Sequence, residues 1–154
     1  MNYQRAITPT IVIADQPTET DLAALKGEGY VGVVNLRNDG EPEQPIGTAA
    51  EGEKVRAAGL DYVHMGVGAA PMSVSGVESV CKFLDDHADG KVLVHCRKGG
   101  RAAAIVLIHQ AQTHGWSPAE AAAKGAAIGL QVDGNLRVMV ENYLDDHRKE
   151  HDPV

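Results

Sequence analysis

Cys96 and Arg101 are the pair of side chains in this sequence best suited to chemistry. A cysteine thiolate is a strong nucleophile, and the planar guanidinium of arginine can bind two oxygens of a tetrahedral oxyanion. Four residues separate the two, and each is basic or a glycine: Arg97, Lys98, Gly99 and Gly100. The spacing predicts that Cys96 attacks the central atom of a small oxyanion, held by Arg101 and by the residues between them.

The segments on either side of this loop predict how Cys96 is positioned. Residues 92–94 form a short apolar run, typical of a buried strand in a parallel sheet, and residues 102–108 have the composition of a well-packed helix. Cys96 is therefore expected to face a helix N-terminus, where free backbone N–H groups and nearby cations stabilise a thiolate. The alternative is a structural cysteine buried beside basic surface residues.

Length and composition limit the function classes. The chain has 154 residues, 44% of them hydrophobic and 23% charged, which fits a single globular domain over residues 1–154. A net charge of −7 disfavours nucleic-acid binding, and against it the Cys96 loop is a local positive site suited to a small anionic substrate or a phosphorylated protein. We expect a cytoplasmic protein with no membrane span, no metal and no cofactor, and the oligomeric state stays open.

The order of the predicted elements indicates an α/β fold. Strands are expected at 10–14, 30–36, 60–67 and 92–94, and helices are expected to begin near Thr18, Thr48, Ser75, Arg101, Ser117 and Asn135. The pattern predicts a central, mostly parallel sheet of four to five strands flanked by helices, with an anion-binding loop between the last central strand and its helix. Residues 145–154 are expected to be a frayed charged tail.

Two other motifs each have a structural and a functional interpretation. Cys81 lies on the apolar face of a predicted helix, so core packing is favoured, although a resolving thiol for Cys96 is the alternative. His147 and His151 are four residues apart, as in some metal pairs, but a solvated tail is favoured.

Three motifs in order resemble the cysteine-dependent phosphatases of the dual-specificity superfamily. They most resemble the small bacterial phosphatase-like domains also found attached to beta-lactamase-like hydrolases. The motifs are Gln16-Pro17, the segment 36–41 with the sequence Leu-Arg-Asn-Asp-Gly-Glu, and the Cys96–Arg101 loop. The resemblance implies a phosphatase-like fold in which Cys96 is the nucleophile, Arg101 the oxyanion clamp, and His95 a residue that orders the loop.

The sequence departs from that family pattern in three places. Phosphatases of the superfamily have five residues between cysteine and arginine, whereas the four found here resemble the rhodanese-type sulfurtransferases. The aspartate that usually follows the third strand as general acid is absent, and Ala102 stands where a hydroxyl residue is common. Asp39 and Glu41 are the candidates for the missing acid, with turn formation and solvent exposure as their structural alternatives.

The sequence therefore supports three functions. The first is hydrolysis of phosphate monoesters through a phosphocysteine intermediate, the second is sulfur transfer through a Cys96 persulfide, and the third is anion binding with little catalysis. Arg37 either adds positive charge to the site or pairs with Glu41.

Overall fold

A five-stranded sheet forms the centre of the computed structural model, which describes residues 1–68 and 70–151, with side chains described up to residue 146. The strands lie in the spatial order β1-β2-β5-β3-β4. Their bounds are Gln4–Thr8 for β1, Ile11–Ala14 for β2, Tyr30–Asn35 for β3, Asp61–His64 for β4 and Lys91–His95 for β5. Strands β2, β5, β3 and β4 are parallel to one another, and of the described strands only β1 runs antiparallel, so the predicted mostly parallel sheet is confirmed.

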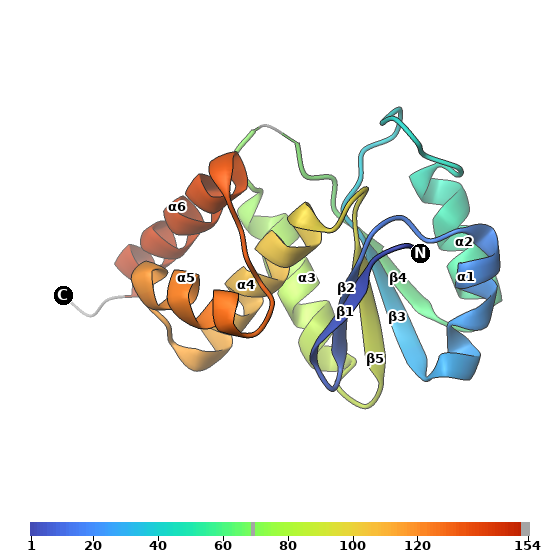
Figure 1. The fold of residues 1–154 in the computed structure, drawn as a ribbon, viewed down its shortest axis with the longest axis horizontal. Helices are drawn as coiled ribbons and strands as arrows, with labels where there is room; N and C mark the ends of the chain where they lie inside the picture. Colours follow the sequence, from blue (N-terminus) through green and yellow to red (C-terminus); the bar gives the residue numbers. More distant parts are fainter. Residues whose placement is uncertain (69, 152–154) are drawn as a thin grey trace.

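Helices cover both faces of this sheet (Figure 1). On one face lie α1 (Glu19–Ala24), the short 3₁₀ helix η1 (Lys26–Glu28) and α2 (Thr48–Ala57). On the other lie α3 (Val74–Asp86) and α4 (Gly100–His114), with α5 (Pro118–Ala127) and α6 (Gly134–His151) packed outside α4. Strand β5 alternates between two apolar layers, because Leu93 faces α1 and α2 while Val92 and Val94 face α3 and α4.

Side-chain caps explain where several helices begin. Thr18 accepts a hydrogen bond from the backbone N–H of Asp21, whose carboxylate accepts one in return, and this capping box begins α1. Ser117 and Glu120 form the same arrangement at α5, with Pro118 at the first helical position. These starts agree with the sequence prediction.

The structure differs from the prediction at the start of the chain. Strand β1 was not expected, because its residues are mostly exposed and lack the apolar alternation of a strand. The frayed charged tail expected over residues 145–154 stays a prediction: α6 continues to His151, and residues 152–154 lie outside the described residues. The candidate metal pair His147 and His151 lies outside the described side chains. No helix in the described part of the chain is long and apolar enough to cross a membrane.

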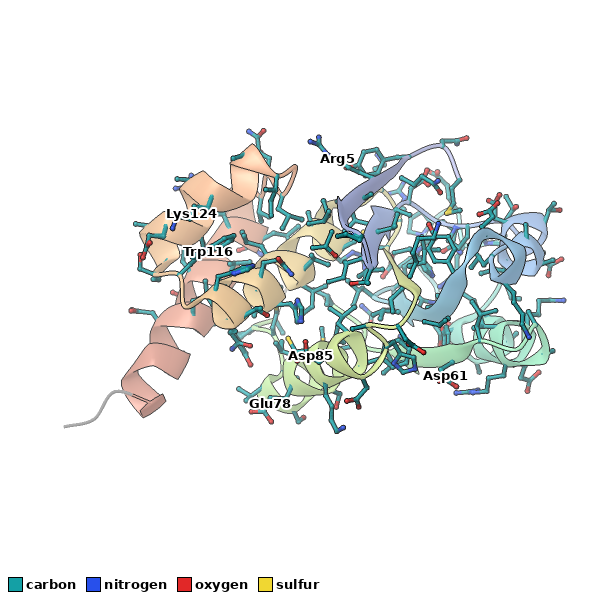
Figure 2. The ribbon with its side chains drawn as sticks, turned by 90° about the horizontal axis from the view of Figure 1, so that it is seen from below. Arg5, Asp61, Glu78, Asp85, Trp116 and Lys124 are labelled. Carbon is teal, nitrogen blue, oxygen red and sulfur yellow. The ribbon has the colours of Figure 1, made fainter. Side chains whose placement is uncertain are left out.

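Cys81 packs against the larger apolar layer, as the helical pattern predicts. Burial raises the pKa of its thiol to about 12, with a further contribution from the carboxylates of Asp85 and Glu78 on the same helix (Figure 2). At neutral pH Cys81 is therefore a protonated thiol, which is a poor nucleophile and a poor partner for disulfide exchange.

Candidate active site

Cys96 directly follows the central strand β5, at the carboxyl edge of the sheet. Its side chain is on the α4 side, and the residue is only 2% exposed. The backbone N–H of Gly99 donates to Sγ at 3.1 Å. Gly99 adopts φ +104°, and a β-carbon there would lie 2.9 Å from the ring of Tyr3, so both the backbone and the space favour glycine. The sequence prediction of a glycine-bearing loop that turns an N–H toward Cys96 agrees with this geometry.

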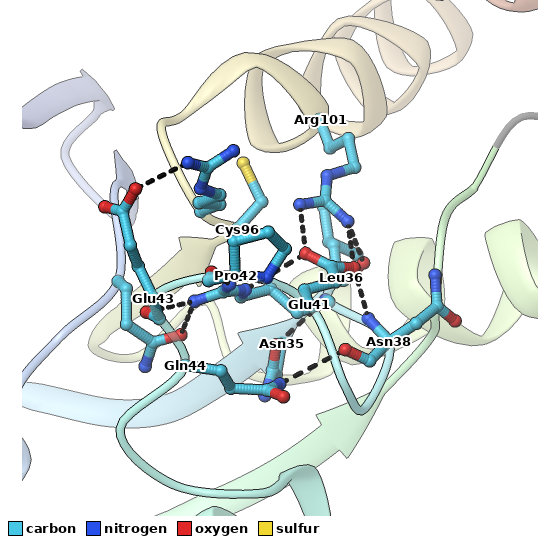
Figure 3. Close-up of polar contacts among 12 residues, drawn as sticks. Asn35, Leu36, Asn38, Glu41, Pro42, Glu43, Gln44, Cys96 and Arg101 are labelled. Carbon is cyan, nitrogen blue, oxygen red and sulfur yellow. Dashed lines mark hydrogen bonds and ion pairs between the residues drawn. The ribbon is translucent and has the colours of Figure 1, made fainter.

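Arg101 projects from the first turn of α4 toward the loop that follows β3 (Figure 3). Its two terminal nitrogens each donate to one oxygen of Glu41 at 2.7 Å, so the pair is bidentate. One of these nitrogens also donates to the carbonyl oxygens of Val67 at 3.1 Å and Leu36 at 3.4 Å. Segments after three parallel strands therefore meet at one guanidinium.

Arg101 still has donors for a ligand beside Cys96. A guanidinium has five N–H groups. Nη1 uses both of its N–H groups on Glu41 and the two carbonyls, and Nη2 uses one on Glu41, so one N–H on Nη2 and the N–H on Nε remain. The pKa of Arg101 is raised first by the hydrogen bonds to Glu41 and also by hydrogen bonding and charge attraction to Cys96. The guanidinium thus interacts with both Glu41 and the Cys96 sulfur, and its remaining N–H groups are available to an anion bound beside Cys96 (Figure 3).

Glu41 is ionised in this arrangement. Hydrogen bonds from Arg101 are the largest cause that lowers its pKa to about 2, against burial, which acts in the opposite direction. The backbone N–H of Asn38 at 2.6 Å and Nε of Arg37 at 3.1 Å add to the effect. Glu41 has no proton to donate at neutral pH, so its predicted role as general acid does not fit the structure. It fixes the orientation of Arg101 instead.

The Glu41 carboxylate should make folding stability depend on acid. Its pKa falls from 4.5 in the unfolded chain to about 2, which corresponds to roughly 3 kcal/mol. Because the folded pKa is the lower one, this contribution is complete above the unfolded pKa and is lost as the pH falls through the folded pKa. We expect Glu41→Gln to lower the free energy of urea unfolding at neutral pH. This deficit should shrink as the pH falls from 4.5 to about 2. An equal deficit in unfolding free energy at neutral pH and at acid pH would contradict this assignment.

Asp39 has a structural role at the start of α2. Its carboxylate accepts from the backbone N–H of Thr48 at 2.8 Å and from the Thr48 hydroxyl at 3.2 Å. A carboxylate at this position satisfies a free helix N–H and interacts favourably with the helix dipole. Asp39 is exposed and turned toward α2, so its predicted role as general acid is not supported either.

Arg37 organises the loop that carries Glu41. Its side chain is fully buried, and its guanidinium donates to Glu41, to the Gln16 side chain at 2.8 Å and to the carbonyl oxygens of Pro42 and Glu43. The predicted pairing with Glu41 is therefore observed, and the alternative of free positive charge in the site is not. Glu43 has φ +58°, a strained value for a side chain other than glycine, and Arg37 holds its carbonyl in place.

The other basic residues of the loop differ in exposure. Arg97 pairs with the exposed Glu43 at 2.5 Å and borders an open hollow of about 450 Å³. This hollow is lined by Asn2, residues 15–18, residues 43–45 and Arg97. Lys98 is exposed at the surface. Arg97 therefore lies at the edge of this hollow, whereas Lys98 does not line it.

His95 contacts a residue that the sequence analysis did not identify. Its Nε2 atom lies 2.7 Å from Oε2 of Glu51 on α2, and both side chains are fully buried. The sequence held a signal for this contact, because Glu51 precedes the buried Val55 by four residues and so shares its face of the helix. A carboxylate on a buried helix face requires a polar partner.

Comparison with known proteins assigns the chain to a family. A family model described as "Beta-lactamase hydrolase-like protein, phosphatase-like domain" matches residues 3–113. The chain belongs to this family. A beta-lactamase hydrolase-like protein of Agrobacterium fabrum is 31% identical over 106 residues, which are 68% of this chain and 24% of that protein. The phosphatase-like chain thus spans about a quarter of this relative.

Solved structures share the fold of this phosphatase-like chain. A DUF442 protein of Shewanella putrefaciens CN-32 has a TM-score of 0.71 at 23% identity, over 97% of this chain and 93% of that one. The active form of Tk-PTP has a TM-score of 0.75 at 20% identity, over 93% of this chain and 96% of that one. These structures show a tyrosine-phosphatase-like fold, and the family model confirms the resemblance to the phosphatase-like domains of beta-lactamase hydrolase-like proteins.

Proposed function

We propose that this chain hydrolyses phosphate monoesters through a phosphocysteine on Cys96. In the first step Sγ attacks phosphorus, an S–P bond forms, and the P–O bond to the leaving group breaks. In the second step water attacks phosphorus and releases phosphate and the Cys96 thiolate. The observation that carries the proposal is the position of Sγ, between the N–H of Gly99 and the guanidinium of Arg101 at the start of α4. We propose a small anionic molecule or a phosphorylated protein as the substrate.

Neither of the two candidate acids among the described residues is placed to protonate the leaving oxygen, because Glu41 is ionised and Asp39 caps α2. General acid catalysis typically contributes ~10²–10⁴-fold, and the benefit is largest for basic leaving groups. We therefore expect kcat/KM to fall steeply across a series of aryl phosphates as the leaving phenol becomes more basic, and alkyl phosphates to react slowest. Asp39→Asn should leave the slope unchanged. If kcat/KM did not depend on the basicity of the leaving phenol, or if that dependence became steeper in Asp39→Asn, a proton donor would be shown to act.

Sulfur transfer is a second candidate, favoured by the four-residue spacing between Cys96 and Arg101. In that reaction Sγ would attack the outer sulfur of thiosulfate, an S–S bond would form, and sulfite would leave with its electron pair. Cyanide or a thiolate would then take the outer sulfur and restore the Cys96 thiolate. Sulfite needs no proton to leave, so the lack of a general acid is no obstacle.

One pair of assays separates these functions. The purified chain is given para-nitrophenyl phosphate, and separately thiosulfate with cyanide, and release of phosphate and of thiocyanate is measured. Acid quenching followed by mass spectrometry tests for a phosphoryl group on Cys96. Phosphate release with a trapped phosphocysteine supports the first function. Thiocyanate alone supports the second, and sulfate binding without either product would leave anion binding as the function.

A further inference from the structure

The contact between Glu51 and His95 is a fully buried ion-pair geometry close to Cys96. Successive side chains of a strand alternate between the faces of its sheet. His95 therefore lies on the α2 side, whereas Cys96 lies on the α4 side. Burying a carboxylate costs free energy that packing does not recover, so apolar residues of similar volume often replace such pairs without loss of stability. A role in the neighbouring site would account for this choice of residues.

Glu51 reaches the Cys96 loop by two routes. In the first, Oε2 binds Nε2 of His95, and the other ring nitrogen lies 3.4 Å from the carbonyl oxygen of Cys96. In the second, Oε1 accepts from the side chain of Gln16 at 3.1 Å, and the backbone N–H of Gln16 donates to the carbonyl of Arg97 at 3.3 Å. The carbonyls of two consecutive loop residues are thus both linked to one carboxylate on α2.

The same network extends to the loop that positions Arg101. Gln16 accepts from Arg37 at 2.8 Å, and Arg37 donates to Glu41, the partner of Arg101. Glu51 therefore sits at the junction between the loop that carries the cysteine and the loop that orients the guanidinium. The charge of Glu51 strengthens both of its hydrogen bonds, because bonds to an ionised acceptor are roughly twice as strong as neutral ones.

We propose that Glu51 is a positioning residue for Cys96, an inference that rests on the proposed function of Cys96 as the nucleophile. Its carboxylate fixes the His95 ring through the 2.7 Å contact to Nε2, as carboxylates do for metal-bound histidines. The fixed ring and Gln16 hold the Cys96 and Arg97 carbonyls, and through them the direction in which Sγ points. Glu51 itself contacts no substrate.

The test replaces Glu51 by glutamine, which keeps the shape of the side chain and removes its charge. We expect kcat for para-nitrophenyl phosphate and the rate of Cys96 alkylation by iodoacetamide at neutral pH each to fall roughly tenfold. KM should stay near the wild-type value, because the anion-binding groups are unchanged. Glu53→Gln is the matched control: it makes the same change on an exposed position of α2 and should leave both rates unchanged.

A purely structural pair would behave differently in a double variant. In Glu51→Gln/His95→Gln two neutral amides can hydrogen-bond to each other. We therefore expect this variant to be thermally more stable than Glu51→Gln, while kcat and the rate of alkylation stay low. Recovery of both rates together with stability would overturn the positioning role, as would wild-type rates in a folded Glu51→Gln. Alkylation needs only a reactive Cys96, so a wild-type protein that neither alkylates there nor releases phosphate would contradict the proposed function instead.

Discussion

The Cys96→Ser variant is expected to lose phosphate release by a factor of at least about 10³. A serine hydroxyl is a weak nucleophile unless a neighbouring base removes its proton. The Gly99 N–H donates to Sγ at 3.1 Å, and the Arg101 guanidinium attracts the sulfur. Both groups are donors, so they stabilise a thiolate and cannot activate a hydroxyl. Steady-state release from para-nitrophenyl phosphate measures the loss.

The chain offers a matched control for this variant in its other cysteine. Cys81 is a protonated thiol, and its sulfur contacts Gln112 at 3.9 Å. Cys81→Ser should therefore keep wild-type kcat and KM and change only thermal stability by a small amount. Cys96→Ser should still bind vanadate or sulfate, because Gly99 and Arg101 remain. Equal losses of activity in the two variants would contradict the assignment of Cys96 as nucleophile.

The fold could be predicted from the sequence wherever the signal is local. Residues 92–94 are apolar on both faces because β5 is the central strand, covered on both sides by helices. Strand β1 carries no such signal, because it pairs with β2 through its backbone at the edge of the sheet and its side chains are mostly exposed. An edge strand of this kind is specified by its partner and not by its own pattern.

The residues of the candidate site also differ in how far the sequence alone predicts their roles. Cys96 and Arg101 could be identified because one short loop brings them together. Glu41 could be placed near the site from the carboxyl-end rule for parallel strands, but its chemistry depends on Arg101, which is distant in the sequence. A carboxyl group beside that guanidinium is a fixed carboxylate, whereas the same group facing Cys96 alone would be a general acid, and only the tertiary structure distinguishes the two.

Arg101→Lys is expected to lower kcat for para-nitrophenyl phosphate by about 10²–10³-fold, the range found when a donor to a developing oxyanion is removed. A lysine keeps the positive charge but is a point charge without the planar fork. It cannot contact both oxygens of Glu41 and also present donors on the Cys96 side, as Arg101 does. The loss should therefore appear in kcat, where transition-state contacts act, more than in KM.

Arg97→Lys is the matched control, because it makes the same substitution in the same loop. Arg97 pairs with the exposed Glu43 at the edge of the hollow, and an exposed ion pair contributes little. We expect this variant to change KM by a few-fold at most and to leave kcat nearly intact. Since charge is conserved in both variants, a large difference between them isolates the geometry of the guanidinium at position 101. Similar, small effects in both would mean that Arg101 serves to hold Glu41 and its loop and takes no part in binding the phosphoryl oxygens.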